Sequence, residues 1–361
     1  MRWSFRLATV AGTDIRIHLT FLLLLAWYGF VAWQAGGPEA ARMAVVFLLL
    51  AFACVLLHEY GHILMARHFG IRTPDVLLSP IGGLARLERM PEEPRQELLV
   101  ALAGPLVTAL LAAGLWAVIR LTSVGGDLTR FDPAQTGLIA SLFQLNIVLL
   151  LFNLLPAFPM DGGRVLRALL VTRIGMVRGT RVAARIGQGF AVLFGIWGLL
   201  GPPLLIIIAG FIYLAAEAEA SAVETRAAGA GVTAAEMMVT DLRTLRVYAT
   251  LEEAVRLLLA GEQREFPIVD NDGRLEGLLT RDDLVRGLAQ YGPGATVGQV
   301  MSRPGDPLQP HTPFDTALAR LRGSRLPALP VVNDAGQVIG LLTADNITDL
   351  LLVRRHLPRL P

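Results

Sequence analysis

The chain has 361 residues, of which 53% are hydrophobic and only 17% are charged, and its formal net charge is +2. Because the apolar residues are concentrated before Ala216, this composition excludes an ordinary soluble globular protein and predicts a membrane domain followed by a soluble tail. The small net charge gives no reason to expect a nucleic-acid partner. With Cys54 as the only cysteine, an intramolecular disulfide is also excluded.

Six apolar segments each approach the roughly 20 residues that a helix needs to cross a bilayer. They are Ile17–Trp33, Met43–Ala66, Leu98–Ile119, Gly137–Leu155, Ile186–Leu200 and Leu204–Ala216. The first lacks the small-residue cleavage motif of a secretory signal, so we expect it to be retained. The predicted fold is a polytopic α-helical membrane domain with about six transmembrane helices and small β segments.

Arginine is unevenly distributed among the connections between these segments. It is frequent before the first segment and in the connections at 67–95 and 164–185, and it is rare in the opposite loops. Cytoplasmic loops carry the excess of positive charge in membrane proteins. We therefore expect a multi-pass protein of the cell membrane whose N- and C-termini are both cytoplasmic.

The sequence His58-Glu59-Tyr60-Gly61-His62 interrupts the second apolar segment. On a helix, residues four apart share a face, so both imidazoles can reach one ion while the glutamate lies on the same side. This spacing suits zinc, with the glutamate as a general base. Ionisable groups within a membrane helix are costly, so their default explanation is function.

Cys54 lies four residues before His58, and one interpretation is that its thiol faces the metal. The alternative is a small apolar packing residue, since free cysteines are commonly buried in this way.

A hydrolytic zinc site needs three protein ligands and an open position, and the two histidines supply only two. The best third ligand is Asp161, in the segment that runs from Asn153 to Gly163 at the end of the fourth predicted span. Two prolines end the regular helix there, and Gly162 and Gly163 permit a tight backbone path that turns the carboxylate toward a neighbouring helix.

These two motifs, His-Glu-x-x-His in an early span and Asn-x-x-Pro-x-x-Pro-x-Asp-Gly-Gly later in the chain, resemble those of the site-2 protease family of intramembrane metalloproteases. The resemblance covers about residues 1–220. It implies one Zn²⁺ held by His58, His62 and Asp161, with Glu59 as the general base. It also implies that Asn153 lies near the reacting carbonyl, for which the alternative is an interhelical hydrogen bond.

The segment from Asp75 to Leu87 contains two apolar runs separated by Gly82 and Gly83, and it predicts a pair of strands beside the site. Since a helical substrate hides its amides, pairing with an edge strand would hold it extended for cleavage. We therefore assign Gly82 and Gly83 to substrate binding, with an inert turn as the alternative.

An internal repeat follows the membrane domain. Thr233, Met238, Pro267, Gly277 and Thr280 recur at a constant offset as Thr296, Met301, Pro330, Gly340 and Thr343. Each copy is predicted to contain a helix, two strands around a turn, and a second helix, and the pair resembles a tandem cystathionine-β-synthase (CBS) module of α/β (α+β) class. The predicted domains are 1–220 for the protease, 221–231 for a flexible linker, and 232–290 and 295–355 for the CBS repeats.

The CBS resemblance implies an adenine nucleotide, ATP, ADP or AMP, as a regulatory ligand. Thr280 and Asp283 fit the family pattern of a hydroxyl residue followed by a ribose-binding aspartate, whereas the second copy departs from it with Thr343 and Asn346. The alternative is a module that forms a homodimer without binding nucleotide.

Together these features predict a zinc endopeptidase that cuts the membrane-embedded segment of a single-span protein in regulated intramembrane proteolysis. Two other classes remain open from the sequence: a CBS-regulated metal or ion transporter, and a catalytically silent nucleotide-sensing scaffold.

Overall fold

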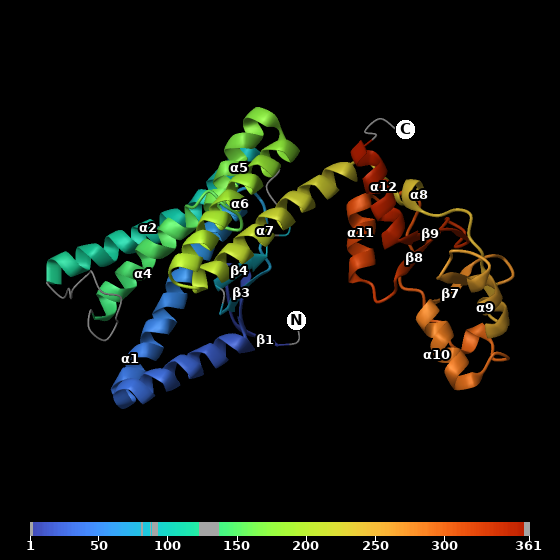
Figure 1. Cartoon of the computed structure of the whole chain (residues 1–361), viewed down its shortest axis with the longest axis horizontal. Coiled ribbons are helices and arrows are strands. Elements are labelled where there is room, and N and C mark those ends of the chain that lie inside the picture. Colours follow the sequence, from blue (N-terminus) through green and yellow to red (C-terminus); the bar gives the residue numbers. More distant parts are fainter. Residues whose placement is uncertain (1–2, 81, 87, 89–92, 123–136, 357–361) are drawn as a thin grey trace. The chain divides into compact units, whose positions relative to one another are not determined.

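A computed structural model describes residues 3–80, 82–86, 88, 93–122 and 137–356. The chain forms two compact units, Met1–Val223 and Glu224–Pro361 (Figure 1).

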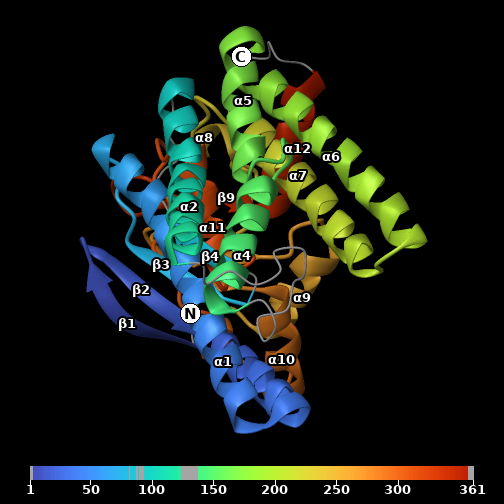
Figure 2. The ribbon, with the colours of Figure 1, turned by 90° about the vertical axis from the view of Figure 1, so that its left-hand side faces the viewer.

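The first unit is built from apolar helices. They are α1 (Leu19–His68), α2 (Pro94–Thr122), α4 (Leu138–Asn153), α5 (Asp161–Ile174), α6 (Met176–Leu200) and α7 (Leu204–Ala228). Within the described residues, α1, α2, α6 and α7 are long and apolar enough to cross a membrane, and α4 is a shorter apolar helix. Helix α2 packs against α1, α4 and α5, and Figure 2 shows α2 and α5 side by side.

Helix α1 contains both of the first two predicted spans. Its 50 residues would extend for about 75 Å as a straight helix, more than twice the thickness of a bilayer core. Gly36 and Gly37 leave helical geometry and Pro38 follows them, so α1 is bent into two arms (Figure 1). These arms with α2, α4, α6 and α7 coincide with the six predicted segments, and the predicted polytopic helical fold is confirmed.

The last two helices are longer than predicted. Helix α6 begins at Met176 rather than Ile186, and α7 continues to Ala228 rather than ending at Ala216. The charged residues in these extensions pair between helices, as in the contact of Arg181 with Glu217 at 2.8 Å, instead of marking the helix ends. The predicted flexible linker at 221–231 is therefore wrong over most of its length, because it is helical to Ala228.

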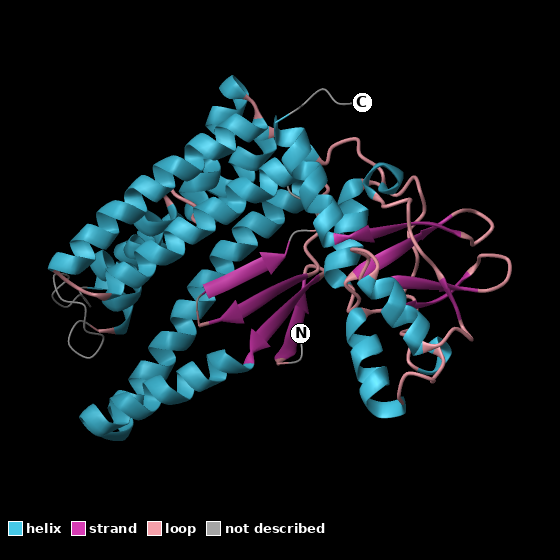
Figure 3. Ribbon diagram, turned by 45° about the vertical axis from the view of Figure 1, so that its right-hand side comes forward, coloured by secondary structure: helices cyan, strands magenta, loops and turns pink. Residues whose placement is uncertain are grey.

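A small four-stranded sheet lies beside α1 (Figure 3). Its strands are β1 (Ser4–Val10), β2 (Thr13–His18), β3 (Asp75–Ser79) and β4 (Gly82–Arg86), in the order β1-β2-β3-β4. Strands β2 and β3 are parallel, and the other neighbours are antiparallel. Ile15, Val76 and Leu78 pack with Ile63 of α1, which fixes the sheet against the second arm of that helix.

The second unit repeats one pattern twice, as predicted. The first copy contains α8 (Ala234–Met237), β5 (Leu245–Arg246), α9 (Leu251–Leu259), β6 (Phe266–Val269), β7 (Leu275–Leu279) and α10 (Arg281–Tyr291). The second contains the 3-10 helix η1 (Val297–Gln299), α11 (Phe314–Gly323), β8 (Ala328–Val332), β9 (Val338–Thr343) and α12 (Ala344–His356). Each copy has an antiparallel strand pair whose turn contains a glycine with positive φ, Gly273 or Gly336. The two apolar cores each combine both copies, because Met237 of α8 packs with the second copy and Val297 of η1 packs with the first.

Candidate metal centre

Both histidines of the first motif lie on one face of the second arm of α1. His58 and His62 are buried, and their Nε2 atoms are 3.1 Å apart. The i, i+4 spacing predicted this arrangement, since the two side chains are one helical turn apart.

Asp161 completes the group from a different part of the chain. It is the first residue of α5, and its Oδ2 atom lies 3.1 Å from His58 Nε2 and 3.2 Å from His62 Nε2. Ligand atoms at the corners of a tetrahedral zinc site with bonds of about 2.0–2.1 Å are roughly 3.3 Å apart, so this triangle fits the ion. Within the described part of the chain this is the one cluster of possible metal ligands, and Cys54 does not belong to it.

Glycines without a Cβ leave room for the three side chains where the helices and the loop approach closely. A Cβ at Gly104 of α2 would stand 2.2 Å from His62 Nε2 and 2.8 Å from His58 Cε1, so only glycine fits beside the imidazoles. A Cβ at Gly162 would meet the carbonyl oxygen of Leu155 at 2.3 Å. The loop before α5 therefore folds tightly onto the start of that helix and presents Asp161 to α1.

Outer hydrogen bonds from α2 hold both imidazoles. The Nδ1 atom of His62 is 2.7 Å from the carbonyl oxygen of Val100, and that of His58 is 2.9 Å from Thr108 Oγ1. A carbonyl oxygen only accepts, so His62 Nδ1–H donates, and in the neutral imidazole Nε2 is then the nitrogen available to bind a metal. Thr108 donates to the carbonyl oxygen of Gly104 at 3.4 Å, which leaves its own lone pair for His58. Val100 and Thr108 could not be predicted from the sequence, because no local pattern relates α2 to the histidines.

Glu59 lies between the histidines in sequence and beside β4 in space. It is half-buried, and a Cβ at Gly83 would stand 2.7 Å from Glu59 Cγ and 3.3 Å from its Oε1. The predicted strand pair thus brings Gly83 against the carboxylate. Gly82 occupies the first position of β4 with a φ of 129°, a conformation that other residues rarely adopt.

Asn153 is the last residue of α4 and is half-buried. In the part of the chain that the structure describes, its side chain makes no hydrogen bond. The alternative role for Asn153, an interhelical hydrogen bond that stabilises the bundle, therefore has no support here.

In the second unit, Thr280 and Asp283 line a cavity of about 570 Å³. Thr280 caps α10 and donates to Asp283 Oδ2 at 2.8 Å, while Ser302 donates to the same oxygen at 2.9 Å. The other charged side chains around the cavity are Arg264, Glu265, Arg281, Asp282, Arg286 and Arg325. Burial raises the pKa of the Glu265 carboxyl, while the positive charge of Arg264 partly opposes that increase.

The second copy reproduces this cap with an amide in place of the carboxylate. Thr343 Oγ1 lies 2.5 Å from Asn346 Oδ1, and the backbone N–H of Asn346 donates to the hydroxyl at 3.2 Å. The two half-sites therefore have the same local geometry and differ in charge.

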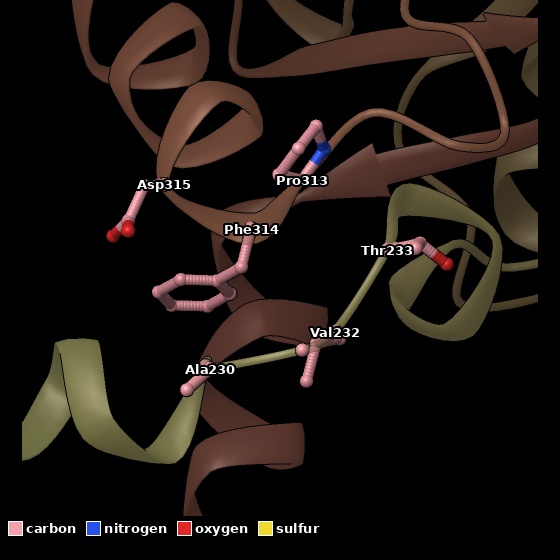
Figure 4. A pocket seen from close by; sticks show the side chains of 8 residues that line it. Ala230, Val232, Thr233, Pro313, Phe314 and Asp315 are labelled. Carbon is pink, nitrogen blue, oxygen red and sulfur yellow. The ribbon is translucent and has the colours of Figure 1, made fainter.

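Another hollow, of about 230 Å³, lies between residues 229–233 and 313–315 (Figure 4). Its polar side chains already have partners: Thr233 donates to Glu236 at 3.0 Å, and Asp315 pairs with Arg226 at 3.8 Å. With no convergent polar groups to orient a ligand, this hollow is a packing feature.

Comparison with known proteins identifies the two domains of the chain. The model of peptidase family M50 matches residues 46–136 and 134–194, and the CBS domain model matches 234–290 and 297–353. A zinc metalloprotease of Methanocaldococcus jannaschii is 34% identical over 77% of this chain and 78% of its own length. A relative from Synechocystis is 31% identical over 97% of this chain and 96% of its own.

Among solved structures, the site-2 protease from Methanocaldococcus jannaschii is 35% identical and covers 60% of this chain and 95% of that one, with a TM-score of 0.46. The relative named as a zinc metalloprotease aligns with 77% of this chain, so the transporter and silent-scaffold interpretations are not retained. The chain belongs to peptidase family M50, the site-2 protease family of zinc metalloproteases, and carries a C-terminal pair of CBS domains.

Proposed function

We propose that the protein is an intramembrane zinc endopeptidase that cleaves the membrane-embedded segment of single-span proteins. In this proposal His58, His62 and Asp161 hold the ion and Glu59 is the general base. The observation that carries it is the convergence of three ligand atoms from α1 and α5, 3.1–3.2 Å from one another, beside Glu59.

The proposed chemistry divides the work among these side chains. Bound zinc supplies Lewis acidity toward the scissile carbonyl and makes an attacking water more acidic. Glu59 takes the proton from that water and delivers it to the leaving amine. Asn153, with no other partner among the described residues, donates a hydrogen bond to the carbonyl oxygen. Val100 and Thr108 keep both Nε2 lone pairs directed at the ion.

Metal removal tests the proposal. We expect that full-length protein reconstituted in lipid vesicles cleaves a co-reconstituted single-span substrate, loses this activity after treatment with a zinc chelator, and regains it when Zn²⁺ is restored. Candidate substrates come from co-expression with single-span regulators, scored for fragments that depend on Glu59. Cleavage that persists in the metal-free protein would contradict the proposal.

We also propose that β4 binds the substrate as an added strand. It is the terminal strand of the described sheet, so its outer edge has unpaired backbone groups, and Gly83 places this strand against Glu59. An unwound substrate that pairs there would place its backbone beside the general base.

Replacing Gly83 by alanine should lower cleavage by roughly ten- to a hundredfold, because the new Cβ displaces Glu59 from the strand, and a misplaced base loses part of the 10²–10⁴-fold that it contributes. Zinc content should stay at the wild-type level. The matched control is Gly114→Ala, since a Cβ at Gly114 meets no atom within 4 Å. Strand pairing itself is checked with N-methylated substrates: a loss of cleavage at every second position supports it, and loss without this period argues against it.

We propose that both termini are cytoplasmic, which places the metal centre near the cytoplasmic end of α1. His62 is close to the end of this helix, where Arg67 and His68 form the basic last turn. A reporter that is active only in the cytoplasm should be active when fused after Pro361, and an inactive fusion would reverse the orientation.

For the CBS pair we propose regulation by an adenine nucleotide in the cavity at Asp283. The carboxylate would accept hydrogen bonds from ribose hydroxyls, and the surrounding arginines would bind phosphate. Regulation requires that the nucleotide bind the open and closed states of the protease with different affinity. Helix α7 is a physical route for this effect, since it is one helix from Leu204 to Ala228 and crosses the boundary between the units at Val223.

Asp283→Asn should weaken ATP or AMP binding to the full-length protein by roughly ten- to a hundredfold, since hydrogen bonds to a charged group contribute about 1.5–3 kcal/mol. The matched control is Asn346→Ala, for which we expect a smaller change, because that half-site carries no charge. Isothermal titration measures both affinities. Equal binding by wild type and Asp283→Asn would favour the other interpretation, a dimerisation module without nucleotide.

A further inference from the structure

A buried ion cluster beside the metal centre has no part in the proposed chemistry. Arg167 of α5 is 4% exposed, and its Nε donates to Oε1 of Glu97 of α2, itself 5% exposed, at 2.6 Å. The same guanidinium donates to Glu219 of α7. One cation thus connects three helices of the membrane unit.

Stability alone does not account for this cluster. Buried ion pairs seldom stabilise a protein more than apolar residues of similar volume, because removing the charges from water costs about as much as their attraction returns.

The position of Arg167 relates it to Asp161. Both residues are on α5, and Asp161 begins this helix. The guanidinium carbon also lies 5.2 Å from the centre of the Phe158 ring, in the loop that leads to Asp161. Arg167 therefore contacts the chain before Asp161 and holds the helix after it.

The partner on α2 relates Arg167 to the histidines. Glu97 lies one helical turn before Val100, whose carbonyl oxygen accepts the hydrogen bond from His62. The same segment of α2 thus orients one imidazole and anchors the helix that carries Asp161.

We infer that Arg167 is a positioning residue for the third metal ligand: it fastens the Phe158 loop and α5 to α2, so that the Asp161 carboxylate stays beside the two imidazoles. This inference rests on the proposed ligand set. A planar guanidinium with several fixed donors can bridge two carboxylates and stack on an aromatic ring. The ammonium of lysine cannot make these three contacts at once.

The test is the affinity for Co²⁺ and the visible absorption spectrum of the Co²⁺-loaded full-length protein in detergent, since this spectrum reports the ligand geometry of the ion. For Arg167→Gln we expect roughly ten- to a hundredfold weaker Co²⁺ binding and an altered spectrum, the range found when a group that orients a metal ligand is lost. Arg167→Lys keeps the buried positive charge and should fall between Arg167→Gln and wild type, which keeps the test valid if the glutamine variant does not fold.

Two further variants make the outcomes distinct. Arg181→Gln removes an ion pair between α6 and Glu217 of α7 that does not include Arg167, and it should leave affinity and spectrum unchanged. Asp161→Ala should change both. If Asp161→Ala changes the spectrum and folded Arg167 variants match wild type, the inference about Arg167 is overturned while the ligand set stands. If Asp161→Ala itself matches wild type, the ligand set fails and the inference with it.

Discussion

The Glu59→Gln protein is expected to bind zinc as wild type does and to lose cleavage by about 10²–10⁴-fold, the usual contribution of a general base. Glutamine has nearly the same shape but cannot accept the proton of the attacking water. The three ligand atoms come from His58, His62 and Asp161, so the change leaves them in place. Zinc per chain by elemental analysis and cleavage of a reconstituted single-span substrate are measured on the same preparation.

The neighbouring Tyr60→Phe change is the matched control. Tyr60 donates a hydrogen bond to the carbonyl oxygen of Val10 at 3.2 Å and is not in the ligand group. We expect activity close to wild type for this variant. Full activity of Glu59→Gln would assign the base to another residue, and loss of zinc from it would make Glu59 a ligand.

Replacing Asp161 by alanine is expected to abolish cleavage and to weaken zinc binding by more than about a hundredfold, because two imidazoles alone leave the ion without its third protein ligand. Asp161→Asn, which keeps a neutral oxygen donor, should bind zinc more tightly than the alanine variant and less tightly than wild type. Competition with a chelator of known affinity gives the dissociation constants.

Asp75→Asn is the matched control, because it also removes the charge of one buried carboxylate. Asp75 and Asp161 are equally exposed, at 7%, but Asp75 lies on β3 and pairs with Arg86. We expect unchanged zinc affinity for this variant. A similar loss of zinc from both variants would mean that general damage to the fold, and not the loss of a ligand, explains the Asp161 result.

The sequence predicted the features that depend on local patterns. Each of these features lies within a short stretch: the apolar segments, the i, i+4 histidines and the Asp-Gly-Gly motif. The internal repeat allowed the CBS strands to be predicted in both copies. Each copy contains the predicted two strands around a turn, β6 with β7 and β8 with β9.

Features that depend on tertiary pairing were missed. The β1–β2 hairpin turns at Ala11 and Gly12, which have positive φ, and lacks the Asn-Gly or Asp-Gly turn that makes a hairpin recognisable. The extensions of α6 and α7 are rich in charged residues, and in the sequence alone such residues indicate a solvent-exposed segment. In the structure these charges pair across helices, as in the contact between Arg167 and Glu219.

His58, His62 and Asp161 are expected to hold one zinc ion, and X-ray absorption at the zinc edge tests this on wild-type protein and His58→Ala. We expect two imidazoles and oxygen donors at about 2.0–2.1 Å in wild type, with one imidazole lost in the variant. A sulfur atom at about 2.3 Å, which would come from Cys54, or a spectrum that the His58→Ala change does not alter, would contradict it.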